Sequence, residues 1–166
     1  MHRHPSLVPL SHQHQHGLAL SVLIERGLPG DPTEAKIQEL RRQSLAFADV
    51  ELGGHFKVEE ELVFPVIRAA FGSSDLIDGL VDDHREMEAL SEEIRSSSGK
   101  PLLKALATFG SLLRQHIRTE ERKLFQEIQE RLSEEEIQAL GSRINEDLSK
   151  VCPSTQTLPW TTPASE

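Results

Sequence analysis

Apolar residues recur at intervals of three and four over most of the chain, which is the spacing of one face of an α-helix. This pattern predicts long helices over about residues 10–26, 33–70, 74–96 and 101–131, and a shorter helix after residue 133. No stretch alternates apolar and polar residues over a useful length, so we expect no β-strand. Four long helices with short links predict an all-α fold: an antiparallel up-down four-helix bundle with a short fifth C-terminal helix on its outside.

Local signals support several of these helix boundaries. Thr33 is a good N-cap for the second helix, and Ser133 with Glu136 forms a capping box for the fifth. Within the second helix, Gly53-Gly54 indicates either a close helix–helix approach or a local kink. Pro65 indicates a bend or a break near the end of the same helix.

The same pattern divides the chain into four parts. We expect a flexible N-terminus over residues 1–9, the bundle over 10–132, an accessory helix over 133–150 and a flexible tail over 151–166. Trp160 lies in this tail, and we expect it to be free rather than docked on the domain or on a partner.

Two of the predicted helices carry nearly the same motif, in which His is followed by Glu four residues later. One reads His55-Phe56-Lys57-Val58-Glu59-Glu60, and the other reads His116-Ile117-Arg118-Thr119-Glu120-Glu121. Residues four apart lie on one face of a helix, so the His and the first Glu of each motif can hold one metal ion or bridge two. The second Glu of each motif is expected to point outward.

Further histidines lie on the other two long helices. His84 and Glu88 repeat the His-to-Glu spacing on the third helix, and His12, His14 and His16 cluster on the first. A single pair of this kind occurs by chance as a solvated ion pair. Its repetition on three successive helices, among apolar residues where an unpaired Glu would be costly, predicts a dinuclear metal site. Imidazole with carboxylate suits iron, manganese or zinc.

The net charge of the chain indicates which classes of binding partner are disfavoured. The chain has 166 residues, with 18 Lys and Arg against 27 Asp and Glu, for a net charge of −9. This balance disfavours nucleic acid and anionic membrane surfaces as partners. We see neither a membrane-spanning stretch nor a secretory signal, and the one cysteine, Cys152, favours a reducing, cytoplasmic setting.

Together these motifs resemble the hemerythrin-like, or HHE cation-binding, domains. The resemblance covers about residues 7–132. It rests on the two motifs quoted above, on Asp83-His84-Arg85-Glu86, and on Leu10-Ser11-His12-Gln13-His14-Gln15-His16-Gly17-Leu18, which is similar to the first-helix motif of the family. The resemblance implies a non-haem di-iron centre inside a four-helix bundle, with manganese or zinc as alternatives to the two iron ions.

Carried over by motif, the resemblance implies terminal ligands and bridging ligands. The terminal ligands would be His14, His55, His84 and His116. Glu59 and Glu120 would bridge the two metals. His14 aligns best with the first-helix motif, ahead of His12 and His16. Glu88 stands where the oxygen-carrying hemerythrins have a second His, and it is either a seventh ligand or lies outside the ligand shell.

The expected function is binding or sensing of O2, NO or peroxide, rather than simple oxygen carriage or the activity of a defined enzyme. A carboxylate-rich di-iron oxidase, peroxidase or ferroxidase is the first alternative. The second is a metal-stabilised helical interaction module, in which the fifth helix and the tail serve a partner or a homodimer.

Overall fold

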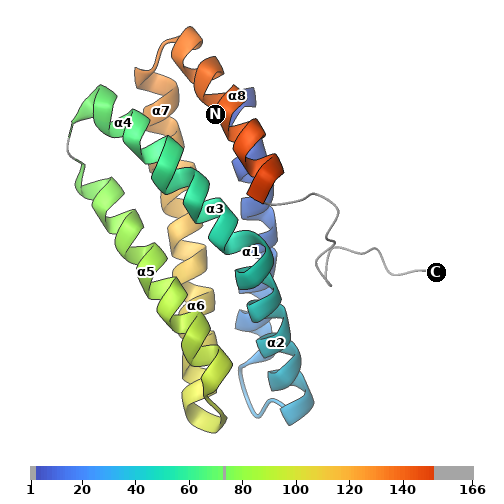
Figure 1. Cartoon of the computed structure of the whole chain (residues 1–166). Helices are drawn as coiled ribbons and strands as arrows, with labels where there is room; N and C mark the ends of the chain where they lie inside the picture. The colour runs from blue at the N-terminus through green and yellow to red at the C-terminus, as the bar shows by residue number, and fades with distance from the viewer. Residues whose placement is uncertain (1–2, 73, 152–166) are drawn as a thin grey trace.

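The computed structural model describes residues 3–72 and 74–151, and this part of the chain is helical throughout, without a β-strand (Figure 1). The α-helices are α1 (Val8–Gly27), α2 (Glu34–Phe47), α3 (Gly53–Val58), α4 (Phe64–Phe71), α5 (Asp75–Ser96), α6 (Gly99–Thr119), α7 (Phe125–Arg131) and α8 (Glu134–Val151). A 3-10 turn, η1 (Pro5–Leu7), precedes α1. Three π-helical turns, η2 (Ala48–Leu52), η3 (Glu59–Val63) and η4 (Glu120–Leu124), lie within the long helices.

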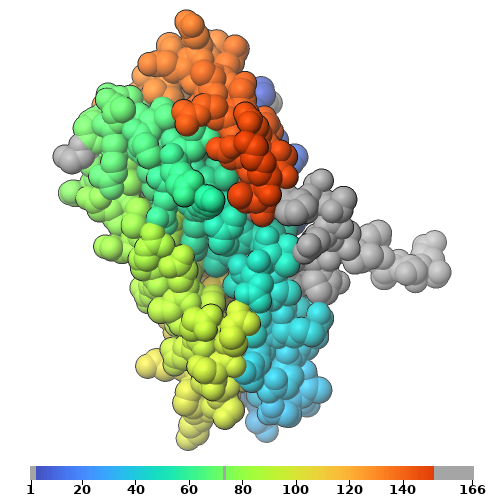
Figure 2. All heavy atoms as spheres, viewed as in Figure 1, coloured from blue at the N-terminus to red at the C-terminus, as the bar shows by residue number. Residues whose placement is uncertain are grey.

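In the described part of the chain, the helices form four long segments followed by α8, and two of these segments are joined through π turns. α2, α3 and α4 follow one another through η2 and η3, and α6 continues through η4 into α7. α6 packs against both α1 and α5, and α2 packs against α1, α5 and α6. α8 packs across η1, α3 and η3, and Figure 2 shows its atoms directly against those of α3. None of the described helices is both long and apolar enough to cross a membrane.

The caps predicted from the sequence are present. The Thr33 side chain accepts a hydrogen bond from the backbone N–H of Lys36. The backbone N–H of Ser133 donates to the Glu136 carboxylate at 2.8 Å, and the Glu136 N–H donates back to the Ser133 hydroxyl. This reciprocal pair is the predicted capping box, and it lets α8 begin after a sharp change of direction.

The N-terminal turn is fastened to α8. Helical structure begins at Pro5, ahead of the predicted bundle boundary at residue 10, and the Leu7 side chain is fully buried. A Cβ atom added to Gly141 would lie 2.7 Å from the backbone of Ser6, so only glycine allows this approach. The predicted tail and Trp160 lie outside the described residues.

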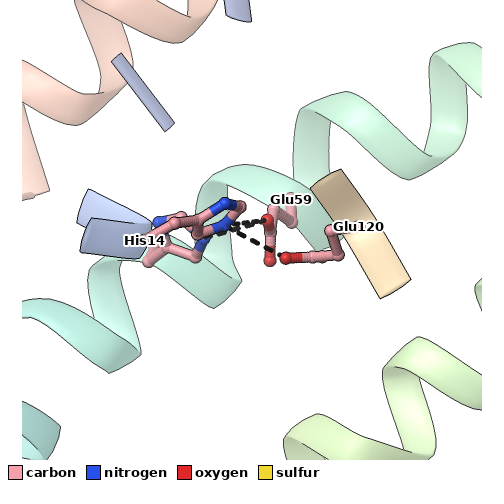
Figure 3. A group of neighbouring side chains, drawn as sticks. His14, Glu59 and Glu120 are labelled. Carbon is pink, nitrogen blue, oxygen red and sulfur yellow. Dashed lines mark hydrogen bonds and ion pairs between the residues drawn. The ribbon is translucent and has the colours of Figure 1, made fainter. Parts of the chain in front are cut away.

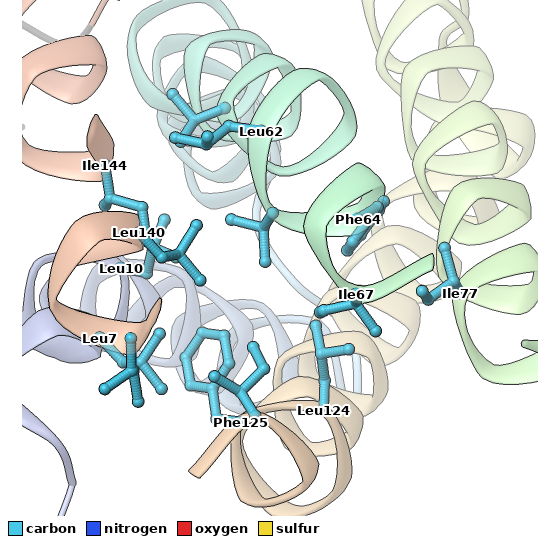
Figure 4. Packing of buried hydrophobic residues seen from close by; sticks show 14 of the residues in the cluster. Leu7, Leu10, Leu62, Phe64, Ile67, Ile77, Leu124, Phe125, Leu140 and Ile144 are labelled. Carbon is cyan, nitrogen blue, oxygen red and sulfur yellow. The ribbon is translucent and has the colours of Figure 1, made fainter. Parts of the chain in front are cut away.

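Buried apolar side chains form two clusters, one toward each end of the long segments. The cluster near α8 includes Leu10, Leu62, Ile77 and Leu124 (Figure 4). The other cluster includes Leu20, Leu52, Phe56, Met87, Leu113 and Ile117. Along their segments, His14, His84 and Glu120 lie between residues of the two clusters. His55 and His116 lie among the nearest residues of the second cluster, and Glu59 lies among those of the first. A polar layer is therefore enclosed between two apolar ones.

None of these three π turns was predicted, and two of them, η3 and η4, lie at the site. The N–H of Phe64 bonds to the carbonyl of Glu59, five residues back, and the N–H of Phe125 bonds to the carbonyl of Glu120 in the same way. Each turn begins at the glutamate of a His-to-Glu motif, and π turns inside α-helices are frequent at functional sites.

The two helix-breaking signals have different outcomes. A Cβ at Gly53 would meet open space, so the close helix–helix approach is wrong at this residue. The backbone irregularity lies instead in η2, directly before it. Pro65 follows η3, and the helix continues through it to Phe71.

Candidate metal centre

Six buried side chains converge in the polar layer, and they come from all four long segments. Each is at most 6 % exposed: His14 from α1, His55 from α3, Glu59 from η3, His84 from α5, His116 from α6 and Glu120 from η4. They form two groups of four that share the two glutamates, and within each group the potential ligand atoms lie within 4.8 Å of one another. We call His14 and His55 the first histidine pair, and His84 and His116 the second histidine pair.

Glu59 lies between the two pairs. Its Oε1 atom is 3.0 Å from Nε2 of His55 and 4.0 Å from Nε2 of His14. Its Oε2 atom is 3.3 Å from Nε2 of His84. Each oxygen of this carboxylate therefore faces a different histidine pair.

Glu120 repeats this arrangement from the other side. Its Oε2 atom is 3.1 Å from Nε2 of His14, and its Oε1 atom is 3.4 Å from Nε2 of His116. Figure 3 shows the carboxylates of Glu59 and Glu120 side by side, both facing the imidazole of His14. Two carboxylates that each face both histidine pairs are the pattern expected of bridging ligands.

All four imidazoles turn Nε2 toward the centre, because Nδ1 of each is bonded to an acceptor outside it. Nδ1 of His14 donates to Glu121 at 2.7 Å, and Nδ1 of His55 donates to Gln13 at 2.7 Å. Nδ1 of His84 donates to Glu60 at 2.8 Å, and Nδ1 of His116 donates to Asp83 at 3.2 Å. With Nδ1 carrying the proton, a neutral imidazole presents the lone pair of Nε2. Such outer partners orient the histidine ligands of metal ions and raise their basicity.

Glu60 and Glu121, the second glutamates of the two motifs, were expected to point outward, and this is wrong for both. Glu60 bonds to His84 and Glu121 bonds to His14, so each reaches a histidine of another segment, and each is also held by an arginine. Arg85 bonds to Glu60, and Arg3 bonds to Glu121. The second Glu of each motif thus fixes a ligand on another helix.

When all four imidazoles are neutral, the side chains of the centre include two carboxylates but no positive charge to balance them. The four oxygens of Glu59 and Glu120 are buried, and no donor among the described residues is aligned to hydrogen-bond them. In each histidine pair, two Nε2 atoms face each other, at 3.0 Å in the first pair and 3.2 Å in the second. Acceptors buried and packed this closely require cations between them.

Protons are the cations available to the metal-free protein. Burial lowers the pKa of His14, but the nearby Glu120 and Glu121 carboxylates outweigh it and raise that pKa to about 9. Burial likewise opposes a charged His84, whose pKa is nevertheless raised by Glu59 and Glu60. Although burial raises the pKa of Glu59, the neighbouring His55 and His84 hold it well below its usual range. The donor set of four imidazoles and two carboxylates suits iron, manganese or zinc, which would take the place of these protons.

The structure does not bring Glu88 to the centre. Its side chain is 52 % exposed and bonds to Arg85 on the outside of α5. The other histidines of α1 also lie apart from the cluster: His12 is exposed, and Nδ1 of His16 contacts the Glu51 carboxylate at 2.9 Å.

Gln13 and Asp83 belong to the quoted motifs, but their role as outer partners of the histidines was not predicted from the sequence. Both adjoin a ligand histidine in the chain, and each bonds to a histidine of another helix. A hydrogen bond between two helices leaves no signal in the apolar periodicity of either helix.

A small cavity adjoins the first histidine pair. It measures about 20 Å³, enough for a molecule of the size of water. Its wall is mostly apolar, with Phe47, Leu52, Phe56, Leu113 and Ile117, and the imidazoles of His14, His55 and His116 also line it. Phe56 stacks on His84 with 3.7 Å between ring centres, which fixes the orientation of that ligand.

Comparison with known proteins agrees with this geometry. The sequence profile of the hemerythrin HHE cation-binding domain matches residues 9–128. The chain belongs to the hemerythrin HHE family. The predicted resemblance is thereby confirmed, and with it the capacity to bind metal ions. No solved structure matches the chain.

One curated relative is a protein named "DNA nickase" from Nostoc sp., to which the chain is 29 % identical over 103 residues. The match covers 61 % of this chain but only 29 % of that relative. The chain therefore spans less than a third of the length of this relative.

Proposed function

We propose that this hemerythrin domain holds two iron ions in a non-haem centre and binds or senses O2, NO or peroxide. The observation that carries the proposal is the convergence of four imidazole Nε2 atoms and four carboxylate oxygens on one buried layer without an aligned donor. The four long segments would form the antiparallel four-helix bundle typical of the family, with α8 across its outside.

Each proposed ligand has a defined task. The first histidine pair would hold one ion and the second pair the other. Glu59 and Glu120 would bridge the two ions, since the oxygens of each face both pairs. When bound, the iron pair supplies a Lewis-acidic, redox-active site for a small ligand.

The rest of the chain prepares this site. Outer hydrogen bonds at Nδ1 keep the Nε2 atoms aimed inward, and the apolar clusters on both sides limit the access of water. The cavity beside the first histidine pair admits only a very small ligand, which favours O2, NO or peroxide over a larger substrate.

The position of Glu88 favours binding or sensing over the alternative of a carboxylate-rich oxidase or ferroxidase. That alternative drew its support from a further carboxylate at the centre, and Glu88 is bonded to Arg85 on the surface instead. We do not extend the DNA-nicking function in the relative's name to this chain, because the match covers 29 % of that protein and the net charge here is −9.

The optical spectrum of the iron-loaded protein tests the proposal. We expect near-ultraviolet charge-transfer bands that change when azide or peroxide is added, and we expect Glu59→Ala to lose them. A protein that takes up only zinc, or whose iron spectrum does not respond to small anions, would contradict the proposed function.

A further inference from the structure

The acceptors at Nδ1 are of the same kind for two of the four histidines and differ for the other two. Each histidine pair contains one imidazole whose Nδ1 donates to a glutamate held by an arginine. In the first pair this chain of contacts is Arg3–Glu121–His14, and in the second it is Arg85–Glu60–His84. These two chains have the same charges in the same order, so they support the two pairs alike.

The remaining two imidazoles differ. Nδ1 of His55 donates to the neutral amide oxygen of Gln13, whereas Nδ1 of His116 donates to the Asp83 carboxylate. The Asp83 side chain is 25 % exposed, and its carboxylate is the acceptor for Nδ1 of His116. The contact to Asp83 is the longer one, at 3.2 Å against 2.7 Å, so the difference lies in charge rather than in distance. A negatively charged acceptor behind Nδ1 makes the imidazole a better donor to a cation.

The Glu51 carboxylate also lies near His55 and interacts with it through charge, but its hydrogen-bond contact is with His16. The Glu51 carboxylate lies on the wall of the adjoining cavity, and Nδ1 of His16 contacts both of its oxygens, at 2.9 and 3.0 Å. The amide of Gln13 therefore remains the acceptor for the imidazole of His55.

We infer that the two metal positions are inequivalent, and that Asp83 makes the position of the second histidine pair the tighter one. This inference rests on the proposed dinuclear centre and goes beyond it, because it assigns the order in which the positions fill. Asp83 and Gln13 are positioning residues: they act on the metal through His116 and His55. The first metal ion taken up occupies the position of His84 and His116, and the second occupies the position beside the cavity.

The test is a titration of metal-free protein with Co²⁺ without oxygen, followed by visible absorption and calorimetry. Two near-isosteric substitutions change one charge each, in opposite senses. Asp83→Asn removes the carboxylate behind His116 and should weaken the first binding step by roughly 10–100-fold, the usual effect of losing an outer partner. Gln13→Glu places a carboxylate behind His55 and should strengthen the second step, so that the gap between the two steps narrows.

The outcomes separate this inference from the proposed function. Two bound Co²⁺ ions, with a first step that weakens only in Asp83→Asn and a second that tightens in Gln13→Glu, would support it. If two Co²⁺ ions bind but the affinities of both binding steps are unchanged in both variants, the inference is overturned and the dinuclear centre remains. The same conclusion follows if Asp83→Asn weakens only the second binding step. Uptake of one ion or none by the unaltered protein would contradict the dinuclear centre itself. Thermal unfolding of the metal-free variants identifies a merely structural effect, which would lower stability without changing the order of filling.

Discussion

Metal uptake by this domain should depend steeply on pH, because His14 must lose a proton before its Nε2 can bind a cation. With its pKa raised to about 9 by Glu120 and Glu121, about one His14 in a hundred is deprotonated at pH 7 in the metal-free protein. This group alone should make the apparent affinity about 100-fold lower at pH 7 than above pH 9, or about tenfold per pH unit.

The stability of the metal-free fold should change in the opposite direction. A pKa raised above the ordinary 6.5 means that protonated His14 stabilises the fold, by roughly 3 kcal/mol. This contribution is complete below pH 6.5 and is lost as the pH rises through about 9. Alkaline conditions should therefore weaken the metal-free protein while they favour metal uptake.

Calorimetry in buffers of different ionisation enthalpy measures the protons released on metal binding, and chelator competition between pH 6 and 9 measures the affinity. His12→Gln is the matched control, since His12 is exposed on the same helix, and it should leave both measurements unchanged. An affinity that stays constant from pH 7 to 9, with no proton released at pH 7, would refute the reasoning about His14.

Two further pairs of substitutions test the ligand set and the packing. Glu59→Ala should reduce the metal content sharply, because Glu59 faces both histidine pairs. Glu88→Ala should leave the metal content unchanged, because Glu88 is bonded to Arg85 on the surface. Metal analysis measures both, and a loss of metal in Glu88→Ala would place that residue at the centre. Gly53→Ala should stabilise the fold by about 0.5–1 kcal/mol, because its Cβ meets open space. Gly141→Ala should destabilise it by about 1–3 kcal/mol, because its Cβ would meet the Ser6 backbone at 2.7 Å. Urea denaturation measures both, and equal shifts would contradict the packing of η1 on α8.

Much of the centre could be predicted from helical spacing. His55 with Glu59 and His116 with Glu120 stand on faces that continue in buried apolar residues, so periodicity alone turns them inward. The choice of His14 over its neighbours needed the family resemblance, because three histidines at alternate positions leave the buried face of α1 undefined.

Glu88 shows where the spacing misleads. Glu59 is followed three and four residues later by Leu62 and Val63, which are both buried. Glu88 is followed at the same distances by Ser91 and Glu92, and the latter is exposed. Glu59 and Glu120 are each followed four residues later by a buried apolar residue, Val63 and Leu124 respectively, whereas Glu88 is not.

The remaining features depend on contacts between helices. Glu60 and Glu121 bond to histidines of neighbouring segments, and such partners cannot be read from one amphipathic pattern. The π turns at Glu59 and Glu120 also lack a residue signature of their own, since ordinary helix-forming residues occupy them.

The most direct test of the central claim is the ratio of iron to protein after anaerobic loading and removal of free metal, measured for the unaltered chain and for Glu59→Ala and Glu120→Ala. If both carboxylates bridge two ions, the unaltered chain should bind two iron ions per molecule, and each substitution should lower the occupancy of both positions. A ratio of one or less in the unaltered chain, or full loading after removal of either glutamate, would contradict the bridged dinuclear centre.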